Sequence, residues 1–246
     1  MLEAIGVIPA RFGSSRFPGK VLADLFGKPL IQWTWEAVRT SSVLKKVIIA
    51  CDNEEVFNVC KNFGAEVVYT SPQIKSGTDR ICEVAKNIDA EIIVNIQADE
   101  PLIRGSMIDD LVVTVAGDPQ VKVATLIKEI TDLSEVHSPD VVKVVIDRHN
   151  FALYFSRSVI PYYREKNSAQ KYYKHLGIYA YRKDFLFVFK NLKSSFLEEA
   201  EKLEQLRILE AGYKIKTVLT VFDTIGVDTP QDLEKVKEYL KTLGHA

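Results

Sequence analysis

Three positive charges lie close together directly after the first apolar segment of the chain. Arg11, Arg16 and Lys20 fall within ten residues, and no acidic residue occurs between Glu3 and Asp24. Arginine offers a planar fork for phosphate oxygens, and lysine offers a mobile point charge. Glycines and small serines in the same stretch let backbone N–H groups approach an anion. The segment therefore predicts a loop that binds phosphates, the alternative being a basic turn without a ligand.

This loop differs from two common phosphate-binding motifs. Five residues separate Gly13 from Gly19-Lys20, whereas a Walker A loop has four, and Val21 has no hydroxyl that could hold Mg²⁺. The chain also contains no G-x-G-x-x-G, which is the fingerprint of dinucleotide-binding proteins. An NAD-dependent oxidoreductase is therefore disfavoured.

Two aspartates occupy positions that suit a metal ion. Asp99 comes just after the apolar segment Glu91–Ile96, and a proline follows two residues later. The carboxyl ends of parallel strands line the ligand crevice of open α/β sheets, and carboxylate oxygens are suitable ligands for Mg²⁺. Asp228 precedes Thr229-Pro230, and these residues alone are explained equally well by a helix cap.

Short apolar segments alternate with segments of helical periodicity in the first half of the chain. The expected strands are Ile5–Pro9, Val47–Cys51, Glu66–Thr70 and Glu91–Ile96. The expected helices are roughly Leu30–Thr40, Glu54–Phe63, Thr78–Asn87 and Ser106–Ala116. Such alternation predicts parallel β-α-β units with right-handed crossovers. Asp52 with Glu55 has the spacing of a capping box, and Thr229 with Pro230 is typical of a helix start.

The second half is more polar and more aromatic. Further strands are expected at Val123–Ile127, Val141–Ile146, Phe151–Phe155, Gly177–Arg182 and near Lys214–Val221. Helices are expected near Phe196–Ala211 and from Thr229 to about Leu243, while Ser158–Tyr173 is interpreted as an exposed excursion from the sheet. We interpret residues 1–246 as a single α/β domain, since no linker or repeat interrupts them.

Composition restricts the class of protein. The chain has 246 residues and a formal net charge of −1, which argues against a protein that coats nucleic acid. Its three cysteines match no zinc or disulfide spacing, and we expect reduced, buried thiols. No apolar stretch approaches 18 residues and the N-terminus does not resemble a signal peptide. We therefore expect a soluble, cytoplasmic protein that contacts no membrane.

Several blocks of sequence resemble the 3-deoxy-manno-octulosonate cytidylyltransferases, also called CMP-Kdo synthetases. The resemblance covers nearly the whole chain, because the blocks follow the order of that family at similar intervals. They are Val7–Lys20, Ser76–Arg80, Val94–Pro101, Val142–Val145, Ala152–Arg157, His175–Tyr179, Leu203–Arg207 and Gly226–Pro230. One departure is Ala98, where the family more usually has glycine.

The resemblance implies a fold and an activity. The fold would be a mostly parallel, Rossmann-like sheet flanked by helices, of the nucleotide-diphospho-sugar transferase type, with a mixed-strand dimerisation excursion in the second half. Residues of about 130–185 would form the sugar-binding and dimerisation part of a homodimer. The activity would be the Mg²⁺-dependent transfer of CMP from CTP to 3-deoxy-D-manno-octulosonate (Kdo), with release of pyrophosphate, in lipopolysaccharide biosynthesis.

The resemblance also implies roles for individual residues. Asp99 and Asp228 would hold the metal and, with Lys20 and Arg11, act in catalysis. The residues implied to bind the nucleotide are Ala10, Arg11, Gly13, Ser14, Arg16, Lys20, Ser76, Gly77 and Arg80. Those implied to bind the sugar acid are Gln97, Arg157, His175, Tyr179, Glu204 and Gln205. Simple structural roles, such as a helix cap at Ser76 or a surface pair between Glu204 and Arg207, remain alternatives.

Two other functions remain open. A cytidylyltransferase that activates sialic acid would have a similar opening loop, so the loop does not discriminate between the two sugars. A non-catalytic nucleotide-binding regulatory module on the same fold is a second alternative. It is expected to have lost the metal carboxylates, whereas Asp99 and Asp228 are both present.

Overall fold

The parallel half of the sheet is built on strand β1 (Ala4–Ala10). The computed structural model describes residues 3–13, 16–74, 76–165 and 170–244. β1 pairs in parallel with β4 (Leu44–Cys51) and β6 (Ile92–Asn95), and β4 pairs with β5 (Glu66–Tyr69). These are the four strands expected from the first half of the sequence, and their parallel arrangement is confirmed.

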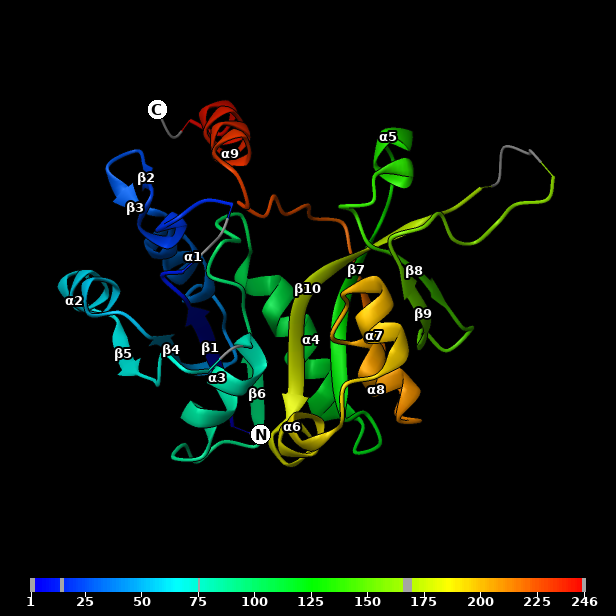
Figure 1. Ribbon diagram of the computed structural model, residues 1–246, viewed down its shortest axis with the longest axis horizontal. Coiled ribbons are helices and arrows are strands. Elements are labelled where there is room, and N and C mark those ends of the chain that lie inside the picture. Colours follow the sequence, from blue (N-terminus) through cyan, green and yellow to red (C-terminus); the bar gives the residue numbers. More distant parts are fainter. Residues whose placement is uncertain (1–2, 14–15, 75, 166–169, 245–246) are drawn as a thin grey trace.

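Helices cover both faces of this sheet (Figure 1). Ile8 of β1 belongs to the same buried cluster as residues of α1 (Leu30–Val38), α2 (Glu54–Asn62) and α4 (Gly105–Gly117). Val7, whose side chain points to the opposite face, is buried with residues of α3 (Gly77–Ala85), α6 (Lys183–Asn191) and α8 (Leu206–Glu210). Both faces of β1 are therefore core, which explains its continuous apolar sequence.

The second half of the chain extends the same sheet with mixed strand directions. β10 (Tyr173–Arg182) runs antiparallel to β6 and to β7 (Val123–Glu129), and β11 (Lys216–Thr220) lies parallel to β7. β8 (Lys143–Ile146) pairs with β10 and with β9 (Ala152–Ser156). The order in the described part of the chain is β11-β7-β10-β6-β1-β4-β5, with β8 and β9 attached beside β10. The expected mixed, mostly parallel α/β fold is confirmed.

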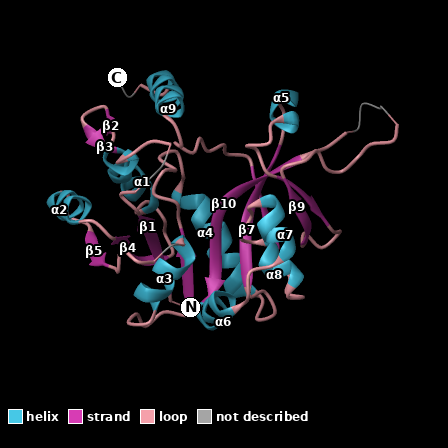
Figure 2. Ribbon diagram, in the orientation of Figure 1, coloured by secondary structure: helices cyan, strands magenta, loops and turns pink. Residues whose placement is uncertain are grey.

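The chain between β9 and β10 leaves the sheet as a projecting arm (Figure 2). We call the described residues 157–165 and 170–172 the arm. Tyr162 at its outer part is 88% exposed. Tyr163 ties the two sides together, because its Oη accepts from the N–H of Lys171 and donates to the carbonyl of the same residue, both at 2.9 Å. The excursion expected at Ser158–Tyr173 is present, and its role in dimerisation stays a prediction.

Small elements close the end of the sheet that carries the first loop. They are the 3₁₀-helix η1 (Lys20–Leu22), the two-stranded β2 (Asp24–Leu25) and β3 (Lys28–Pro29), and the final helix α9 (Pro230–Thr242). Leu233 and Val236 of α9 pack with Leu25 and Leu30. Gly19 has a φ of 68° where the loop enters η1, a conformation that glycine adopts without steric cost.

Two local expectations were wrong. The segment Phe196–Ala211 is not one helix but two, α7 (Phe196–Glu201) and α8, because Lys202 takes a left-handed conformation with φ 54°. This turn lets Leu203 and Leu206 reach the core. α2 is capped by the side chain of Asn53, not by Asp52, whose carboxylate is engaged elsewhere.

The start of α9 and the state of the cysteines agree with expectation, whereas two other helices were not anticipated. Thr229 and Pro230 start α9 as expected, with a full capping box that Asp232 completes. Two helices, α5 (Leu133–His137) and α6, were not expected from the sequence. Cys51, Cys60 and Cys82 are free and buried. Among the helices the structure describes, none has the length and apolar character needed to traverse a bilayer.

Candidate active site

The cationic loop opens onto a cavity at the carboxyl ends of β1 and β6. The side chain of Ala10 is buried at the end of β1, and the chain then turns out of the sheet. We call the space of about 370 Å³ at this edge the cation cavity. Its lining residues come from distant parts of the sequence: Pro9, Arg11, Gly13, Arg16, Lys20, Val21, Gly77, Gln97, Ala98, Asp99 and Asp228. The expected nucleotide contact of Ala10 needs correction, because this residue is fully buried and does not line the cavity. Ser14, also expected to bind the nucleotide, lies outside the described residues.

Asp99 and Asp228 meet at the ammonium group of Lys20. Lys20 Nζ donates to Asp228 Oδ1 at 2.9 Å and also contacts Asp99 Oδ2. Arg16 Nη2 lies 2.9 Å from the second oxygen of Asp228. Burial disfavours the charged ammonium, but the charges and hydrogen bonds of the two aspartates outweigh burial and raise the pKa of Lys20. The structure therefore brings the predicted carboxylate pair together beside the predicted cations.

The acidic pair suits a hard divalent cation. The side chains of Asp99 and Asp228 are 22% and 47% exposed, so their oxygens remain accessible from the cavity. In the described part of the chain, no group of three or more His, Cys, Asp and Glu residues is placed to hold a metal. Mg²⁺ normally takes one or two carboxylates together with substrate phosphates and water. The donor set thus fits Mg²⁺ bound jointly with a nucleotide, and this binding stays a prediction.

Glu100 differs from its neighbour Asp99. Its Oε2 atom is buried and has no hydrogen-bond partner among the described residues. Burial, with the nearby charge of Asp99, raises the pKa of Glu100 to about 8. Glu100 does not line the cation cavity, and we assign it no contact with a ligand.

The segment from Ser76 to Arg80 contributes to the cavity differently from expectation. Gly77 lines it, whereas Ser76 Oγ caps α3 by accepting from the N–H of Asp79 at 2.9 Å. The expected phosphate contact of Arg80 needs correction, because this side chain is fully buried. Its guanidinium donates to Asp52 Oδ2 at 2.8 Å and to the Ile74 carbonyl at 3.2 Å. Arg80 therefore binds protein groups beneath the cavity.

A second, smaller cavity adjoins the first through Gln97, which lines both. We call this space of about 190 Å³ the polar cavity. Its other lining residues are Asn95, His175, Gly177, Tyr179, Tyr181, Phe189, Glu204 and Gln205. Five of the six residues expected to bind the sugar acid are therefore gathered at one place: Gln97, His175, Tyr179, Glu204 and Gln205.

The polar cavity contains buried groups that lack partners. Tyr179 Oη and Gln205 Nε2 are buried and make no hydrogen bond with the part of the chain that the structure describes. Burial raises the pKa of Glu204, whose Oε2 accepts from Thr78 Oγ1 at 2.7 Å. Burial lowers the pKa of His175 to about 3, so the ring is neutral at ordinary pH. Such a cavity can receive a ligand that carries several hydroxyl groups.

Two other expectations in this region are corrected. Arg157 does not line the polar cavity, because its guanidinium donates to the carbonyls of Glu201 and Pro139 at 2.8 and 2.9 Å. Arg207 does not form the surface pair with Glu204 but binds Glu198, with Nε to Oε2 at 2.7 Å. The sequence showed the charges of both arginines but not which acceptors the fold brings to them.

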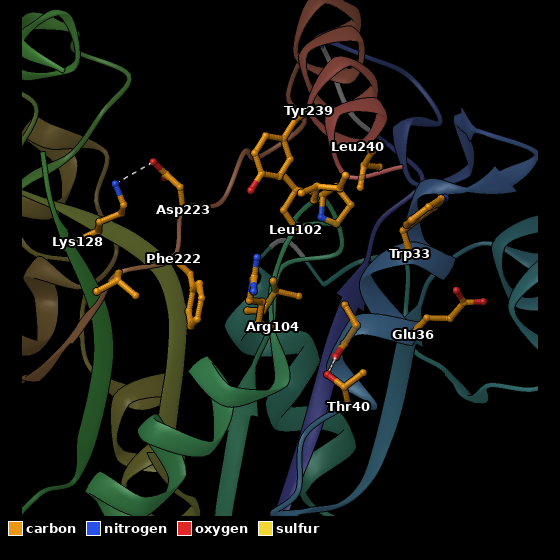
Figure 3. Close-up of a pocket in the computed structure, with 15 residues that line it drawn as sticks. Trp33, Glu36, Thr40, Leu102, Arg104, Lys128, Phe222, Asp223, Tyr239 and Leu240 are labelled. Atoms are coloured by element: carbon orange, nitrogen blue, oxygen red, sulfur yellow. Dashed lines mark hydrogen bonds and ion pairs between the residues drawn. The ribbon is translucent and has the colours of Figure 1, made fainter. Parts of the chain in front are cut away.

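A larger cavity of about 600 Å³ lies between α1, α9 and the segments next to Asp99 and Asp228 (Figure 3). Its walls include Trp33, Leu102, Phe222 and Tyr239. Of its four charged side chains, Lys128 and Asp223 pair with each other at 3.1 Å, and Glu36 pairs with Lys28 outside the lining. This cavity contains none of the expected site residues, and we assign chemistry to the cation cavity because that is where acids and bases converge.

An α/β fold in which a cationic loop faces an acidic pair is typical of proteins that bind nucleotide phosphates together with a divalent cation. The family model described as "Cytidylyltransferase" matches residues 5–215. The 3-deoxy-manno-octulosonate cytidylyltransferase of Geobacter sulfurreducens is 48% identical over 98% of this chain and 100% of its own length. The enzyme of the same name from Solibacter usitatus is also 48% identical, over 97% of this chain and 95% of its own. The chain belongs to the family of 3-deoxy-manno-octulosonate cytidylyltransferases.

Solved structures agree with this assignment. A CMP:2-keto-3-deoxy-manno-octonic acid synthetase in complex with CTP has a TM-score of 0.93 and 43% identity, covering 98% of this chain and 99% of its own. A 4-diphosphocytidyl-2C-methyl-D-erythritol synthase from Anaerococcus prevotii has a TM-score of 0.63 over 97% of this chain and 99% of its own. At 14% identity, the second likeness concerns the fold alone.

Proposed function

We propose that this protein transfers CMP from CTP to Kdo and releases pyrophosphate. The observation that carries the proposal is the meeting of Asp99 and Asp228 at one ammonium group inside a cavity lined by Arg11 and Arg16. The acids supply ligands for Mg²⁺, and the cations supply charge for a triphosphate. The family and the CTP complex of a relative support the choice of nucleotide.

The reaction requires positioning and charge neutralisation more than covalent catalysis. The anomeric hydroxyl of the sugar attacks the α-phosphorus of CTP in line and gives up its proton to solvent, while the bond from the α-phosphorus to the bridging oxygen breaks and pyrophosphate leaves. Arg11, Arg16 and Lys20 neutralise charge on the β- and γ-phosphates as the leaving group forms. Mg²⁺, when bound by Asp99 and Asp228, would supply further neutralisation and polarise the attacking hydroxyl.

The polar cavity is the proposed site of the sugar acid. It shares Gln97 with the cation cavity, so an occupant would lie next to the α-phosphate. Tyr179 Oη and Gln205 Nε2 would each gain a hydroxyl partner. The neutral ring of His175, with Nε2 3.1 Å from Thr125 Oγ1, is suited to a neutral hydrogen bond. Hydroxyl recognition by buried polar groups gives selectivity, because a ligand without those hydroxyls leaves the groups unpaired.

Phosphorus NMR of CTP, Mg²⁺ and the purified protein tests this function. With Kdo, we expect the three CTP signals to be replaced by one phosphodiester signal and pyrophosphate. With sialic acid in place of Kdo, we expect CTP to persist. A reversed preference would identify the alternative cytidylyltransferase, and CTP that stays intact with both sugars would favour the non-catalytic module.

The wider setting is also a proposal. CMP-Kdo formation would serve lipopolysaccharide biosynthesis and would take place in the cytoplasm, where CTP is made available. The absence of a suitably apolar helix in the described residues is compatible with this setting.

A further inference from the structure

We propose that Arg80 and Asp52 form a positioning pair that holds both walls of the nucleotide cavity. Neither residue lines the cation cavity. Their side chains nevertheless connect the cationic loop to the loop that precedes α3. The inference rests on the proposed binding of CTP in the cation cavity, and it gives two buried residues a function in that binding.

Asp52 anchors the cationic loop. It follows the last residue of β4, and its Oδ1 accepts from the N–H of Phe12 at 3.2 Å. The carbonyl of Phe12 in turn accepts from the N–H of Gly19 at 3.3 Å. The two ends of the loop therefore meet at Phe12, and the carboxylate of Asp52 fixes the position of that residue next to Arg11.

Arg80 anchors the opposite wall. One guanidinium nitrogen, Nη2, donates both to Asp52 Oδ2 at 2.8 Å and to the carbonyl of Ile74 at 3.2 Å, while Nη1 binds Thr70 Oγ1. Ile74 lies in the loop that leads to Gly77, which lines the cavity. The buried guanidinium group of Arg80 thus links the segment before Gly77 to the carboxylate of Asp52, which also binds the N–H of Phe12.

This arrangement is not needed for core packing alone. Apolar side chains of similar volume often stabilise a core as well as a buried ion pair does. The pair also fixes the relative position of the two loops, because charge-assisted hydrogen bonds have a defined geometry. Arg80 is 0% exposed and the Asp52 side chain 13% exposed, so water does not weaken these bonds.

Two double variants separate the positioning role from packing. Arg80→Met with Asp52→Asn removes both charges but keeps a side-chain oxygen for Phe12. Arg80→Met with Asp52→Leu has nearly the same volume but removes that acceptor. We expect the Leu double variant to have a KM for CTP about tenfold higher than the Asn double variant, which corresponds to the upper range of one hydrogen bond between neutral groups. The KM for the sugar acid should be the same in both.

Hydrogen–deuterium exchange at the Phe12 amide, measured without CTP, tests the anchor independently of catalysis. We expect faster exchange in the Leu double variant than in the Asn double variant. Lys46→Gln, which breaks an exposed pair with Glu66, is the control and should match the wild type in both measurements. Equal exchange in the two double variants would overturn the inference directly. Faster exchange with an unchanged KM for CTP would show that the loop held by Asp52 does not bind CTP. That result would contradict the proposed CTP site, on which the inference rests.

Arg80→Lys provides the test if the Leu double variant does not fold. Lysine retains the positive charge beside Asp52 but loses the fork that reaches Thr70 and Ile74. We expect the KM for CTP to rise while the KM for the sugar acid is unchanged. Wild-type values for both constants would contradict the role of Arg80.

Discussion

Individual polar groups indicate where the substrates bind. Tyr179 Oη and Gln205 Nε2 are buried without partners, and an unsatisfied buried group costs about 1–3 kcal/mol. Natural proteins retain such groups where a ligand satisfies them. At the other end of the site, Lys20 occupies the space between Asp99 and Asp228. These groups are consistent with the proposed sugar site, and in the proposed metal site the Lys20 ammonium group would have to move away from the two aspartates before a metal ion could bind.

The partly enclosed ring of His175 predicts a dependence of stability on pH. Burial lowers its pKa from the ordinary 6.5 to about 3 in the folded protein, so between these values the unfolded chain binds the proton more readily. The contribution of the neutral His175 ring to the free energy of unfolding is complete above pH 6.5, and it is lost as the pH falls towards 3. Relative to His175→Gln, we expect the free energy of unfolding of the wild type to fall by up to about 1.4 kcal/mol per pH unit in this range. Urea unfolding at several pH values measures it.

His149→Gln serves as the matched control, because His149 is exposed. That variant should follow the wild-type dependence on pH. Parallel curves for His175→Gln and the wild type would show that the ring of His175 is protonated as easily in the folded protein as in the unfolded chain.

The sequence indicated site residues where a side chain of suitable chemistry follows directly after an expected strand. Asp99 could be assigned to the ligand-binding edge of the sheet because it follows the apolar strand expected at Glu91–Ile96. The cations of the loop could be assigned to the same edge because they follow the strand expected at Ile5–Pro9. Arg80 was misplaced for a physical reason: its charge suggested phosphate, but only the fold shows that Asp52 and Ile74 reach it first. Asp52 itself was interpreted as a helix cap, since nothing in the sequence shows its contact with Phe12.

At the scale of elements, helix starts and turns determine where the functional side chains lie. α9 begins directly after Asp228, with Thr229 accepting from the N–H of Asp232. The start of this helix was predictable from Thr229 and Pro230. The break between α7 and α8 was not, because nothing in the sequence marks Lys202 for a left-handed conformation. That break brings Glu204 and Gln205 to the polar cavity.

Thr229→Ala should loosen the start of α9. The side chain of Thr229 satisfies one of the free N–H groups of the helix, and we expect its removal to lower the free energy of unfolding by about 1 kcal/mol. Because Asp228 is the preceding residue, turnover should fall as well. Thr229→Ser keeps the hydroxyl oxygen and should restore both properties, as measured by thermal unfolding and by pyrophosphate release. An Ala variant as active and stable as the Ser variant would contradict this account of the cap.

At the scale of the whole molecule, strand periodicity predicted the layers but not the order of the strands. β10 is inserted antiparallel between β6 and β7, and pairing over such sequence distance depends on tertiary packing. The arm and β9 remain as surface features with apolar side chains, for example Leu153 at 61% exposed and Tyr162 at 88% exposed. Contiguous exposed apolar surface is typical of an interface between subunits, and the family resemblance implies such an interface in this half of the chain.

We predict that the protein is a homodimer formed through the arm and β9. Light scattering should give a mass of twice 27.8 kDa for the wild type. Leu153→Glu places a charge on the expected interface and should give the mass of one chain. Leu219→Glu, at a residue 57% exposed on β11, is the matched control and should remain dimeric. A wild-type protein with the mass of a single chain would contradict the prediction.

We propose that Asp99 and Asp228 bind one divalent ion, and that the Lys20 ammonium group competes with this ion for the two carboxylates when no substrate is present. Mn²⁺, which takes the same oxygen ligands as Mg²⁺, can be titrated into the protein and followed by electron paramagnetic resonance. Asp99→Asn should weaken Mn²⁺ binding by at least about tenfold. Lys20→Met should strengthen it, because the competing ammonium is gone, while Lys45→Met, at an exposed pair with Glu3, should change nothing. Equal affinity of the wild type and Asp99→Asn for Mn²⁺ would contradict the account.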